Sequence, residues 1–372
     1  MATSLLYEIA LGWVPGIGHQ TTKILISYCG SAEAVFKTSR SKLIKIPGVG
    51  QHLASAILSF SDFSKAEAEI EKAQKHGVQI LFYTHSSYPE RLKQLADAPT
   101  LLYYKGNTNL NAEKIISIVG TRSNTAYGKE ITEKIVRELA PYKPIILSGL
   151  AYGIDIIAHR AALEAGLETI AVLGSGIDVI YPSAHKDIAS RMTRQGGLLS
   201  EYSFGTKPDA HHFPARNRIV AGLSDAVLVI EAAEKGGALI TAEIANSYNV
   251  EVLAVPGNVD NKFSEGCNTL IKQHKAHMCT CAEDIANLLN WSNNTNTTLV
   301  NNSSRKKNLP TDLLTEEEKK IVELLISADS LHIDELSWKS QIAVNRLSSI
   351  LLNLEFNGWI KSLPGKKFKI IH

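Results

Sequence analysis

The chain has 372 residues, of which 44% are hydrophobic and 20% are charged. This balance is ordinary for a globular protein and excludes a largely disordered chain. At about 100–200 residues per domain, the length predicts two or three domains. The formal net charge of +2 points to no class of partner, and the middle of the chain carries slightly more acidic than basic side chains. A nucleic-acid site there therefore needs a focused basic pocket.

The sequence also bears on location and on redox chemistry. No run of residues approaches the ~20 consecutive apolar residues that a membrane helix needs. No basic segment precedes the apolar residues of positions 1–12, so we expect no secretory signal peptide. The four cysteines are too few for a disulfide scaffold. These features predict a cytoplasmic protein.

Residues 1–105 are expected to form a helical domain of the helix-hairpin-helix (SAM-like) type. Residues 14–18 (VPGIG) and 46–50 (IPGVG) share one pattern, and each precedes a helix-like stretch. The glycines of such a hairpin permit a tight turn and expose backbone N–H groups where a phosphate can bind. Few basic residues flank either hairpin, so two interpretations stay open, a DNA contact or the packing of a small helical domain.

Residues 106–289 are expected to fold as a Rossmann-like α/β core. Short runs rich in Val and Ile alternate with helix-length stretches, and Gly or Pro follows several of these runs. The runs lie at 115–119, 144–147, 169–173, 226–231 and 251–255, and the expected helices at 128–140, 153–164 and 239–248. Buried strands that alternate with helices predict a parallel sheet covered on both faces. Ligands of such folds bind at the carboxyl ends of the strands.

The C-terminal part has a different character. Residues 290–309 are rich in Asn, Thr and Ser and are expected to form a flexible linker. Residues 310–372 are expected to form a winged-helix-like domain, with helices over 316–326, from 333 and over 344–355 and a two-stranded wing over 359–370. The nearly balanced charge of this segment leaves open whether it binds DNA or a protein surface.

Four loops after the expected strands carry residues that bind phosphate. The first is Gly-Thr-Arg at 120–122, and the second begins with Ser-Gly at 148–149. The third runs from 173 through Tyr-Pro at 181–182 to Lys186, and the fourth is 213–218 (FPARNR), ahead of a helix-like segment. The carboxyl ends of parallel strands meet at one edge of a sheet. We therefore expect glycine N–H groups, hydroxyls and guanidinium groups to converge there on a phosphate.

These loops offer no nucleophile with an adjacent base, so no catalytic residue is expected. Asp155 is expected to cap the helix that it begins, and His159 to pack within it. Residues 173–179 (LGSGIDV) have valine at the third glycine position of a dinucleotide fingerprint, so no nucleotide cofactor is expected. The Cys-x-Cys pair at 279–281 has no second pair and predicts no metal site.

A series of motifs in the core resembles the DNA-processing protein A family (DprA/Smf). The motifs are VGTR (119–122), SGLAYGID (148–155), LGSGIDVIYP (173–182), LLSEY (198–202), FPARNRIVAGLS (213–224), EKGGALITAEIA (234–245) and VPGN (255–258). The resemblance implies a non-enzymatic protein that binds and protects single-stranded DNA in natural transformation and recombination. It also implies that the protein loads the recombinase RecA and forms a homodimer through its Rossmann-like domain.

The resemblance further implies a basic DNA-binding pocket above the sheet. Its residues in this sequence would be Gly120, Thr121, Arg122, Ser148, Gly149, Lys186, Arg216, Asn217, Arg218, Gly236, Gly237 and Thr241. One position departs from the family pattern, because many members read S-G-x-A-R-G-I-D where this chain has Tyr152. One cationic contact is thereby lost, and the tyrosine ring either stacks on a base or packs within the fold.

A second interpretation is a nucleotide-processing enzyme. The core also resembles the lysine-decarboxylase-like phosphoribohydrolases, whose signature is P-G-G-x-G-T-x-x-E. Residues 235–243 (KGGALITAE) keep two glycines, a threonine and Glu243. They lack the leading proline and the glycine before the threonine, and the spacing contains one extra residue. This interpretation predicts that the protein releases a free base from a nucleoside monophosphate and that Glu243→Gln abolishes the reaction.

Overall fold

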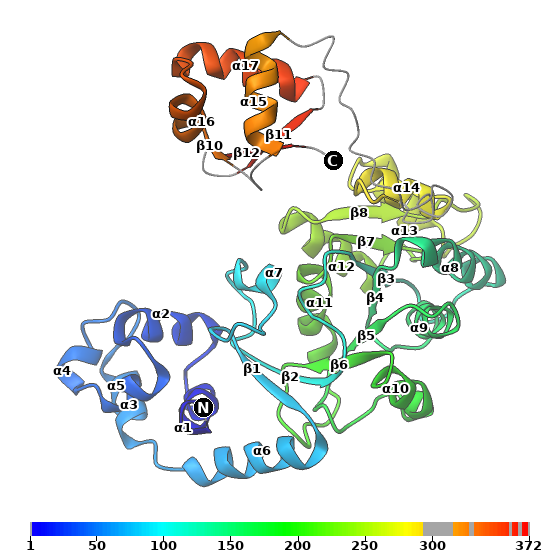
Figure 1. Ribbon diagram of the computed structural model, residues 1–372. Coiled ribbons are helices and arrows are strands. Elements are labelled where there is room, and N and C mark those ends of the chain that lie inside the picture. Colours follow the sequence, from blue (N-terminus) through cyan, green and yellow to red (C-terminus); the bar gives the residue numbers. More distant parts are fainter. Residues whose placement is uncertain (1, 293–314, 327–330, 357–358, 364–366, 371–372) are drawn as a thin grey trace. The chain divides into compact units, whose positions relative to one another are not determined.

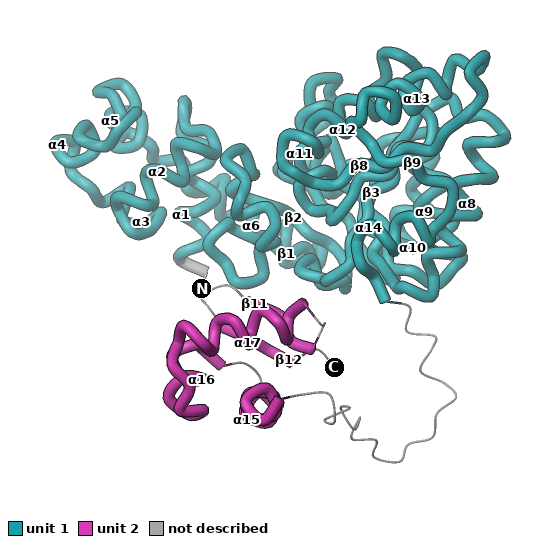
Figure 2. The backbone as a smooth tube through the Cα atoms, turned by 90° about the horizontal axis from the view of Figure 1, so that it is seen from above, with its two compact units in different colours: residues 1–296 teal, residues 297–372 magenta. Residues whose placement is uncertain are grey.

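The computed structural model describes residues 2–292, 315–326, 331–356, 359–363 and 367–370. The chain divides into two compact units, residues 1–296 and 297–372 (Figure 2). Most of the predicted linker, residues 293–309, lies outside the described residues. Among the described helices, none combines the length and the apolar character that a bilayer span requires.

The first unit is built on a nine-stranded sheet with the strand order β1-β2-β6-β5-β4-β3-β7-β8-β9 (Figure 1). The strands are β1 (Gln79–Phe82), β2 (Leu101–Gly106), β3 (Ile115–Val119), β4 (Ile145–Ser148), β5 (Thr169–Val172), β6 (Gly196–Ser200), β7 (Ala226–Val229), β8 (Glu251–Ala254) and β9 (His277–Met278). Strands β3 to β9 are parallel, whereas β1 and β2 are antiparallel to their neighbours. The predicted parallel core is confirmed. Strand β6, which begins with two glycines, was not predicted.

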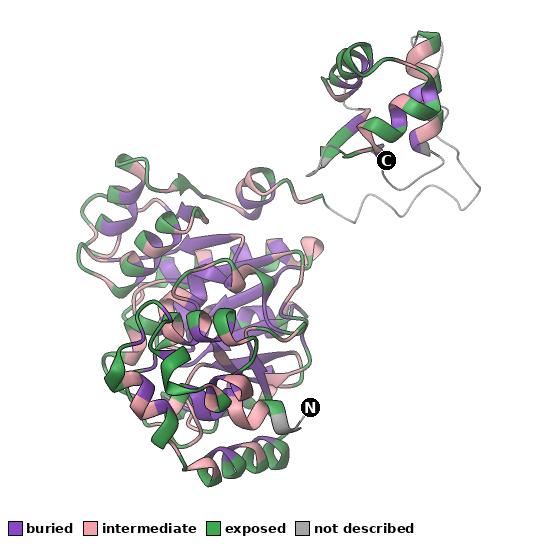
Figure 3. Cartoon of the chain, turned by 90° about the vertical axis from the view of Figure 1, so that its left-hand side faces the viewer, coloured by how far each residue is buried: buried purple, intermediate pink, exposed green. Residues whose placement is uncertain are grey.

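Helices cover both faces of this sheet and bury it between two apolar layers (Figure 3). Alternate residues of β3 point to opposite faces, as the pleat of a strand requires. Ile116 and Ile118 belong to the layer formed with α8 (Ala126–Leu139), α9 (Ile154–Glu164) and α14 (Ala282–Leu288). Ile115 and Val119 belong to the opposite layer, formed with α11 (His212–Gly222), α12 (Gly237–Ser247) and α13 (Glu265–Lys272). Helix α10 (Lys186–Met192) and the 3₁₀ turns η1 (Ala140–Tyr142) and η2 (Ser183–His185) complete the core.

The N-terminal residues are helical, as predicted, and both predicted hairpins lead directly into a helix. Gly16 and Gly48 adopt positive φ angles of 84° and 80°, which glycine tolerates without steric cost. The helices are α1 (Ala2–Trp13), α2 (His19–Cys29), α3 (Ala32–Lys37), α4 (Arg40–Leu43), α5 (Gln51–Ser59), α6 (Phe63–His76) and α7 (Glu90–Lys93).

The helical segment shares a core with the sheet. Ile9 of α1 and Ala73 of α6 belong to one apolar cluster with Tyr103 of β2 and Met192 of α10. Strand β2 pairs with β6, so the sheet extends into residues 79–106. The predicted domain boundary at residue 105 therefore falls inside a strand, because no local pattern had indicated β1 or β2.

The second unit is a winged helix, as predicted. Its elements are α15 (Glu316–Ile326), β10 (Leu331–His332), α16 (Ile333–Ser340), α17 (Val344–Phe356), β11 (Ile360–Leu363) and β12 (Lys367–Ile370). The three strands form a sheet with the order β10-β12-β11. Leu336 of α16, Leu347 and Leu351 of α17 and Ile360 of β11 belong to its buried core.

Gly196 is the position where the sheet is least tolerant of a side chain. Its φ is +143°, and a Cβ atom there would collide with the carbonyl oxygen of Thr169 on the neighbouring strand. We expect Gly196→Ala to lower the free energy of unfolding by more than about 3 kcal/mol, because both backbone strain and a steric clash result. Urea denaturation measures this change.

Gly12→Ala is the matched control. Gly12 is exposed within α1, and no other part of the fold lies within 4 Å of the position that a Cβ atom would take. Alanine is the better helix former, so this variant should gain up to about 1 kcal/mol. Equal stability of the two variants would contradict this account of β6.

Candidate nucleic-acid interface

The strand order creates a crevice between β3 and β7. The chain leaves β3 and adds β4, β5 and β6 on one side, then returns to place β7 on the other side. The loops after β3 and β7 therefore diverge to opposite faces, and ligands of α/β sheets bind at this switch point. A cavity of about 750 Å³ opens there, lined by residues 119–122, by most of 232–241 (Glu234 and Leu239 excepted) and by the first half of α11. Its volume lies within the usual range for ligand sites.

The loop after β3 presents one available guanidinium. The backbone N–H of Thr121 donates to the carbonyl oxygen of Glu231, at 2.7 Å, which fixes the loop against the end of β7. Arg122 is exposed, and its guanidinium lies over the ring of Phe213, 5.6 Å from the centroid. Among the described residues it has no ion-pair partner. Arg122 therefore brings a positive charge to the cavity that no carboxylate of the described fold neutralises.

The loop after β4 is held by a buried ion pair beneath the cavity. Asp155 accepts the backbone N–H groups of Gly149 and Ala151 at 3.1 and 3.3 Å. Arg216 donates to the carbonyl oxygens of Gly149 and Val172, both at 2.5 Å, and lies 3.8 Å from the Asp155 carboxylate. Burial lowers the pKa of Arg216 and raises the pKa of Asp155, and each charge opposes the effect of burial on the other. Arg216 lines the cavity from its floor with its guanidinium already engaged.

The predicted loop 213–218 is helical. These residues form the first turns of α11, which begins at His212, so the prediction of a loop ahead of a helix at 219–222 is wrong. The two arginines of this segment consequently have different partners. Asn217 lines the cavity with Arg216, whereas Arg218 does not.

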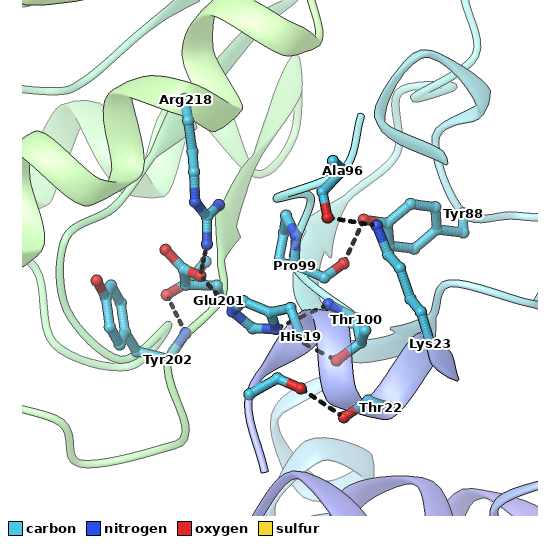
Figure 4. Close-up of polar contacts among 12 residues, drawn as sticks. His19, Thr22, Lys23, Tyr88, Ala96, Pro99, Thr100, Glu201, Tyr202 and Arg218 are labelled. Atoms are coloured by element: carbon cyan, nitrogen blue, oxygen red, sulfur yellow. Dashed lines mark hydrogen bonds and ion pairs between the residues drawn. The ribbon is translucent and has the colours of Figure 1, made fainter. Parts of the chain in front are cut away.

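Arg218 instead joins the core to the helical segment. Its guanidinium donates to the Glu201 carboxylate at 2.5 Å, and the imidazole of His19 at the start of α2 lies 3.4 Å from the same carboxylate oxygen (Figure 4). His19 also accepts the backbone N–H of Thr100 at 3.2 Å. The Glu201 carboxylate is 6% exposed. Arg218 therefore makes a tertiary contact in this structure, and its contact with DNA stays a prediction.

The N-terminus of α12 supplies unpaired backbone donors. Gly236 is the N-cap and Gly237 the first residue of this eleven-residue helix, and both line the cavity. Amide groups in a first turn have no partner within the helix and favour an anion. Thr241, also on the cavity wall, is 2% exposed, and its hydroxyl lies 3.5 Å from the carbonyl oxygen of Gly237.

Of the other predicted site residues, some line the cavity and two do not. Gly120 and Thr121 line the cavity with Arg122 and Gly149. Ser148 is completely buried and donates to the carbonyl oxygen of Ile118 at 2.6 Å. Lys186, at the start of α10, lines a different cavity.

Three lining residues with side chains suited to a nucleotide, Tyr181, Phe213 and Lys235, were not among the predicted set. Tyr181 is 48% exposed, and its ring centroid lies 5.7 Å from that of Phe213. Lys235, just before the N-terminus of α12, is exposed and has no partner among the described residues. Tyr181 and Phe213 belong to motifs already quoted from the sequence. Because aromatic rings stack on bases, their residue type could have marked them as candidate DNA contacts.

Tyr152, at the position of the departure from the family pattern, does not line the cavity. Its side chain is 50% exposed, and its ring packs edge-on against His185 with the centroids 5.0 Å apart. Metal ligation also finds no support within the described ranges, where no group of three or more His, Cys, Asp or Glu residues is placed to hold an ion.

The comparisons with known proteins identify the family. The model of the DNA recombination-mediator protein A family matches residues 79–290, and that of the DprA winged helix domain matches residues 305–366. The protein Smf of Synechocystis is 31% identical over 98% of both chains. The DNA processing protein DprA of Streptococcus pneumoniae is 43% identical over 53% of this chain and 70% of its own. The chain belongs to the DprA/Smf family.

Two solved structures agree with this assignment. The crystal structure of DprA from Streptococcus pneumoniae has a TM-score of 0.67 and 34% identity, and the match covers 76% of this chain and 97% of that one. A structure of DprA from Helicobacter pylori, described for its single-stranded DNA binding mode, has a TM-score of 0.52 and 32% identity, with 57% and 95% covered.

His159 of α9 is a buried imidazole that we expect to make the stability of the fold depend on pH. The side chain is completely buried, and its Nδ1 donates to the Thr169 hydroxyl, which itself donates to the carbonyl oxygen of Ile146. The other ring nitrogen, Nε2, has no hydrogen-bond partner among the described residues. Burial, with smaller effects of Arg216 and His185, lowers the pKa of His159 to about 3.

This pKa predicts a loss of stability in acid. Well above pH ~6.5 the imidazole is neutral in both states, whereas below it only the unfolded chain readily binds the proton. The free energy of unfolding should therefore fall by about 2 kcal/mol between pH ~6.5 and ~4.5 from this residue alone. Urea denaturation at both pH values measures the loss, and His159→Gln should show a correspondingly flatter dependence. An identical dependence in the variant would contradict the assignment.

Proposed function

We propose that this protein is a non-enzymatic mediator that binds single-stranded DNA in the switch-point cavity. The observation that carries the proposal is the cavity lining, in which the unpaired Arg122 guanidinium and the N-terminus of α12 lie beside the rings of Tyr181 and Phe213. Cations and amide groups bind phosphates, and aromatic rings stack on bases of any sequence. The DprA structure from Helicobacter pylori, described for single-stranded DNA binding, supports the same function for this relative.

In this proposal, the phosphates and the bases of the DNA strand contact different groups of the cavity lining. Phosphates would bind Arg122, Lys235 and the amide groups at Gly236 and Gly237, because these donors line one cavity. Bases would stack on the exposed ring of Tyr181. None of these groups reads the edge of a base, so the proposal includes little sequence preference.

The geometry does not favour the phosphoribohydrolase alternative. Glu243 pairs with Lys275 at 2.7 Å, and its side chain is 54% exposed. It lines an open groove along α12 that adjoins the cavity but does not line the cavity itself. The carboxylates that line the cavity are Asp155 and Asp209. Asp155 accepts backbone N–H groups of Gly149 and Ala151, and Asp209 accepts the backbone N–H of His211 at 2.8 Å. A general base for hydrolysis would need a free carboxylate at the ligand.

The proposal extends to protection of the bound strand and to loading of RecA onto it. The description of the matching family as a recombination mediator supports transfer of DNA to a recombinase. The test is the rate of RecA filament assembly on single-stranded DNA, with and without this protein. An unchanged rate would remove RecA loading and leave DNA binding intact.

We also propose a homodimer through the Rossmann-like core. Strand β9 is an edge of the sheet with β8 as its neighbour, and Met278 on it is 59% exposed. Unpaired edges and exposed apolar side chains suit association. Met278→Lys is expected to shift the protein from dimer to monomer in light scattering after gel filtration. A wild-type monomer at micromolar concentration would refute the dimer.

Arg122→Gln tests the DNA site directly. We expect its affinity for labelled oligo-dT to fall about tenfold or more, since a charge-assisted contact is lost. The slope of log affinity against log salt should become shallower by ~0.7, the value for one phosphate contact to a single strand. Fluorescence anisotropy at several salt concentrations measures both quantities.

Arg137→Gln is the matched control, because Arg137 is exposed in the last turn of α8 and lies outside the cavity. It removes the same charge and should leave both quantities unchanged. If both variants bind like the wild type, Arg122 does not contact DNA.

A further inference from the structure

A second cavity, of about 310 Å³, lies where the helical segment meets the core. Its walls come from the end of α6, from β2 and β6, from α10 and from the loops that precede α10 and follow β6. Lys186 lies here, away from the switch-point cavity, and Lys105 of β2 faces the same space. Residues distant in the sequence thus assemble one site.

The charges in this second cavity favour an anion. Neither the Lys105 nor the Lys186 ammonium group has a hydrogen-bond or ion-pair partner in the part of the chain that the structure describes. The carboxylate that lines it, Asp178, accepts the backbone N–H of Gly205 at 2.8 Å. The exposed Asp187 of α10 is not among the lining residues. Two ammonium groups are therefore available to an incoming phosphate.

Apart from Ser190 and Thr193, the rest of the lining is apolar or aromatic. The rings of Phe204 and His76 lie side by side with their centroids 5.9 Å apart. Val78, Ile177 and Leu198 also line the cavity. Flat apolar walls beside two cations suit a base together with its phosphate, and the volume lies at the lower end of the range for small ligands.

The same two loops separate the two cavities and contribute lining residues to both. Ile180 lines the second cavity and the next residue, Tyr181, lines the first. The loop after β6 likewise gives Phe204 to the second cavity and Pro208 to the first. Between them on this loop stands Lys207, which is exposed and has no partner in the described ranges. A DNA strand that runs from the first cavity to the second would therefore pass the ammonium group of Lys207.

We propose that the second cavity binds a further nucleotide of the DNA strand held in the first cavity, with its phosphates on Lys105 and Lys186. This inference rests on the proposed function, because it extends the same DNA path. It gives the junction between helical segment and core a role in binding, and it predicts that the footprint on DNA is longer than the switch-point cavity alone accommodates.

The test compares short and long strands. Labelled oligo-dT of about 6 nucleotides lies near the lower end of typical site sizes of ~4–16 nucleotides, and oligo-dT of about 20 nucleotides exceeds them. In Lys105→Gln/Lys186→Gln, the salt slope for the long strand should become shallower by up to about 1.4, or ~0.7 for each lysine, and affinity should fall several-fold. Binding of the short strand, which the first cavity holds, should remain that of the wild type.

The control is Lys134→Gln/Lys272→Gln, which removes two exposed lysines from α8 and α13. If this control and the test variant bind the long strand equally, the second cavity is not on the DNA path, although the proposed function stands. If the wild type binds neither strand at low salt, the proposed function itself fails. The binding of thymidine monophosphate to the wild type and to the test variant is measured as well. Loss of its binding in the test variant, with the long strand unaffected, would overturn the continuous path in favour of a free-nucleotide site.

Discussion

The candidate DNA site depends on one buried guanidinium. Arg216 is 6% exposed, yet it joins the carbonyl oxygens at the ends of β4 and β5 and offsets the charge of Asp155. Asp155 in turn fixes the amide groups of the loop after β4. Removal of one member of such a pair leaves an uncompensated buried charge, which typically costs about 3–5 kcal/mol. The shape of the cavity floor is therefore tied to the stability of the fold.

Three arginines that look alike in the sequence have different roles in the structure: two support the fold, and one is available to a ligand. Arg216 supports the floor, and Arg218 pairs with Glu201 and so connects the core to α2. Arg122 alone of these three has no carboxylate partner among the described residues, because its side chain extends over Phe213 at the cavity mouth. A buried guanidinium needs its hydrogen bonds satisfied, whereas an exposed one is available to a phosphate.

The helical segment and the sheet are joined by a shared apolar cluster and by ion pairs. Residues of α1, α6 and β2 bury a common apolar cluster with α10, and the Glu201 carboxylate pairs with groups from both sides (Figure 4). The second cavity exists only because these parts meet. Its proposed role in DNA binding thus follows from packing that joins residues distant from one another in the chain.

The sequence by itself determined the strand-helix alternation of the core, the two glycine hairpins, the winged helix and the family, because these follow from local periodicity, turn residues and contiguous motifs. Nine of the twelve site residues predicted from it line the main cavity, since strand-end loops converge in any parallel sheet. Only the tertiary structure decided which cations are free. A helical turn at residues 213–218 directs Arg216 inward and Arg218 toward Glu201. Lys186 lines one cavity with Lys105, which no local pattern encodes, because the direction of a side chain depends on partners distant in the sequence.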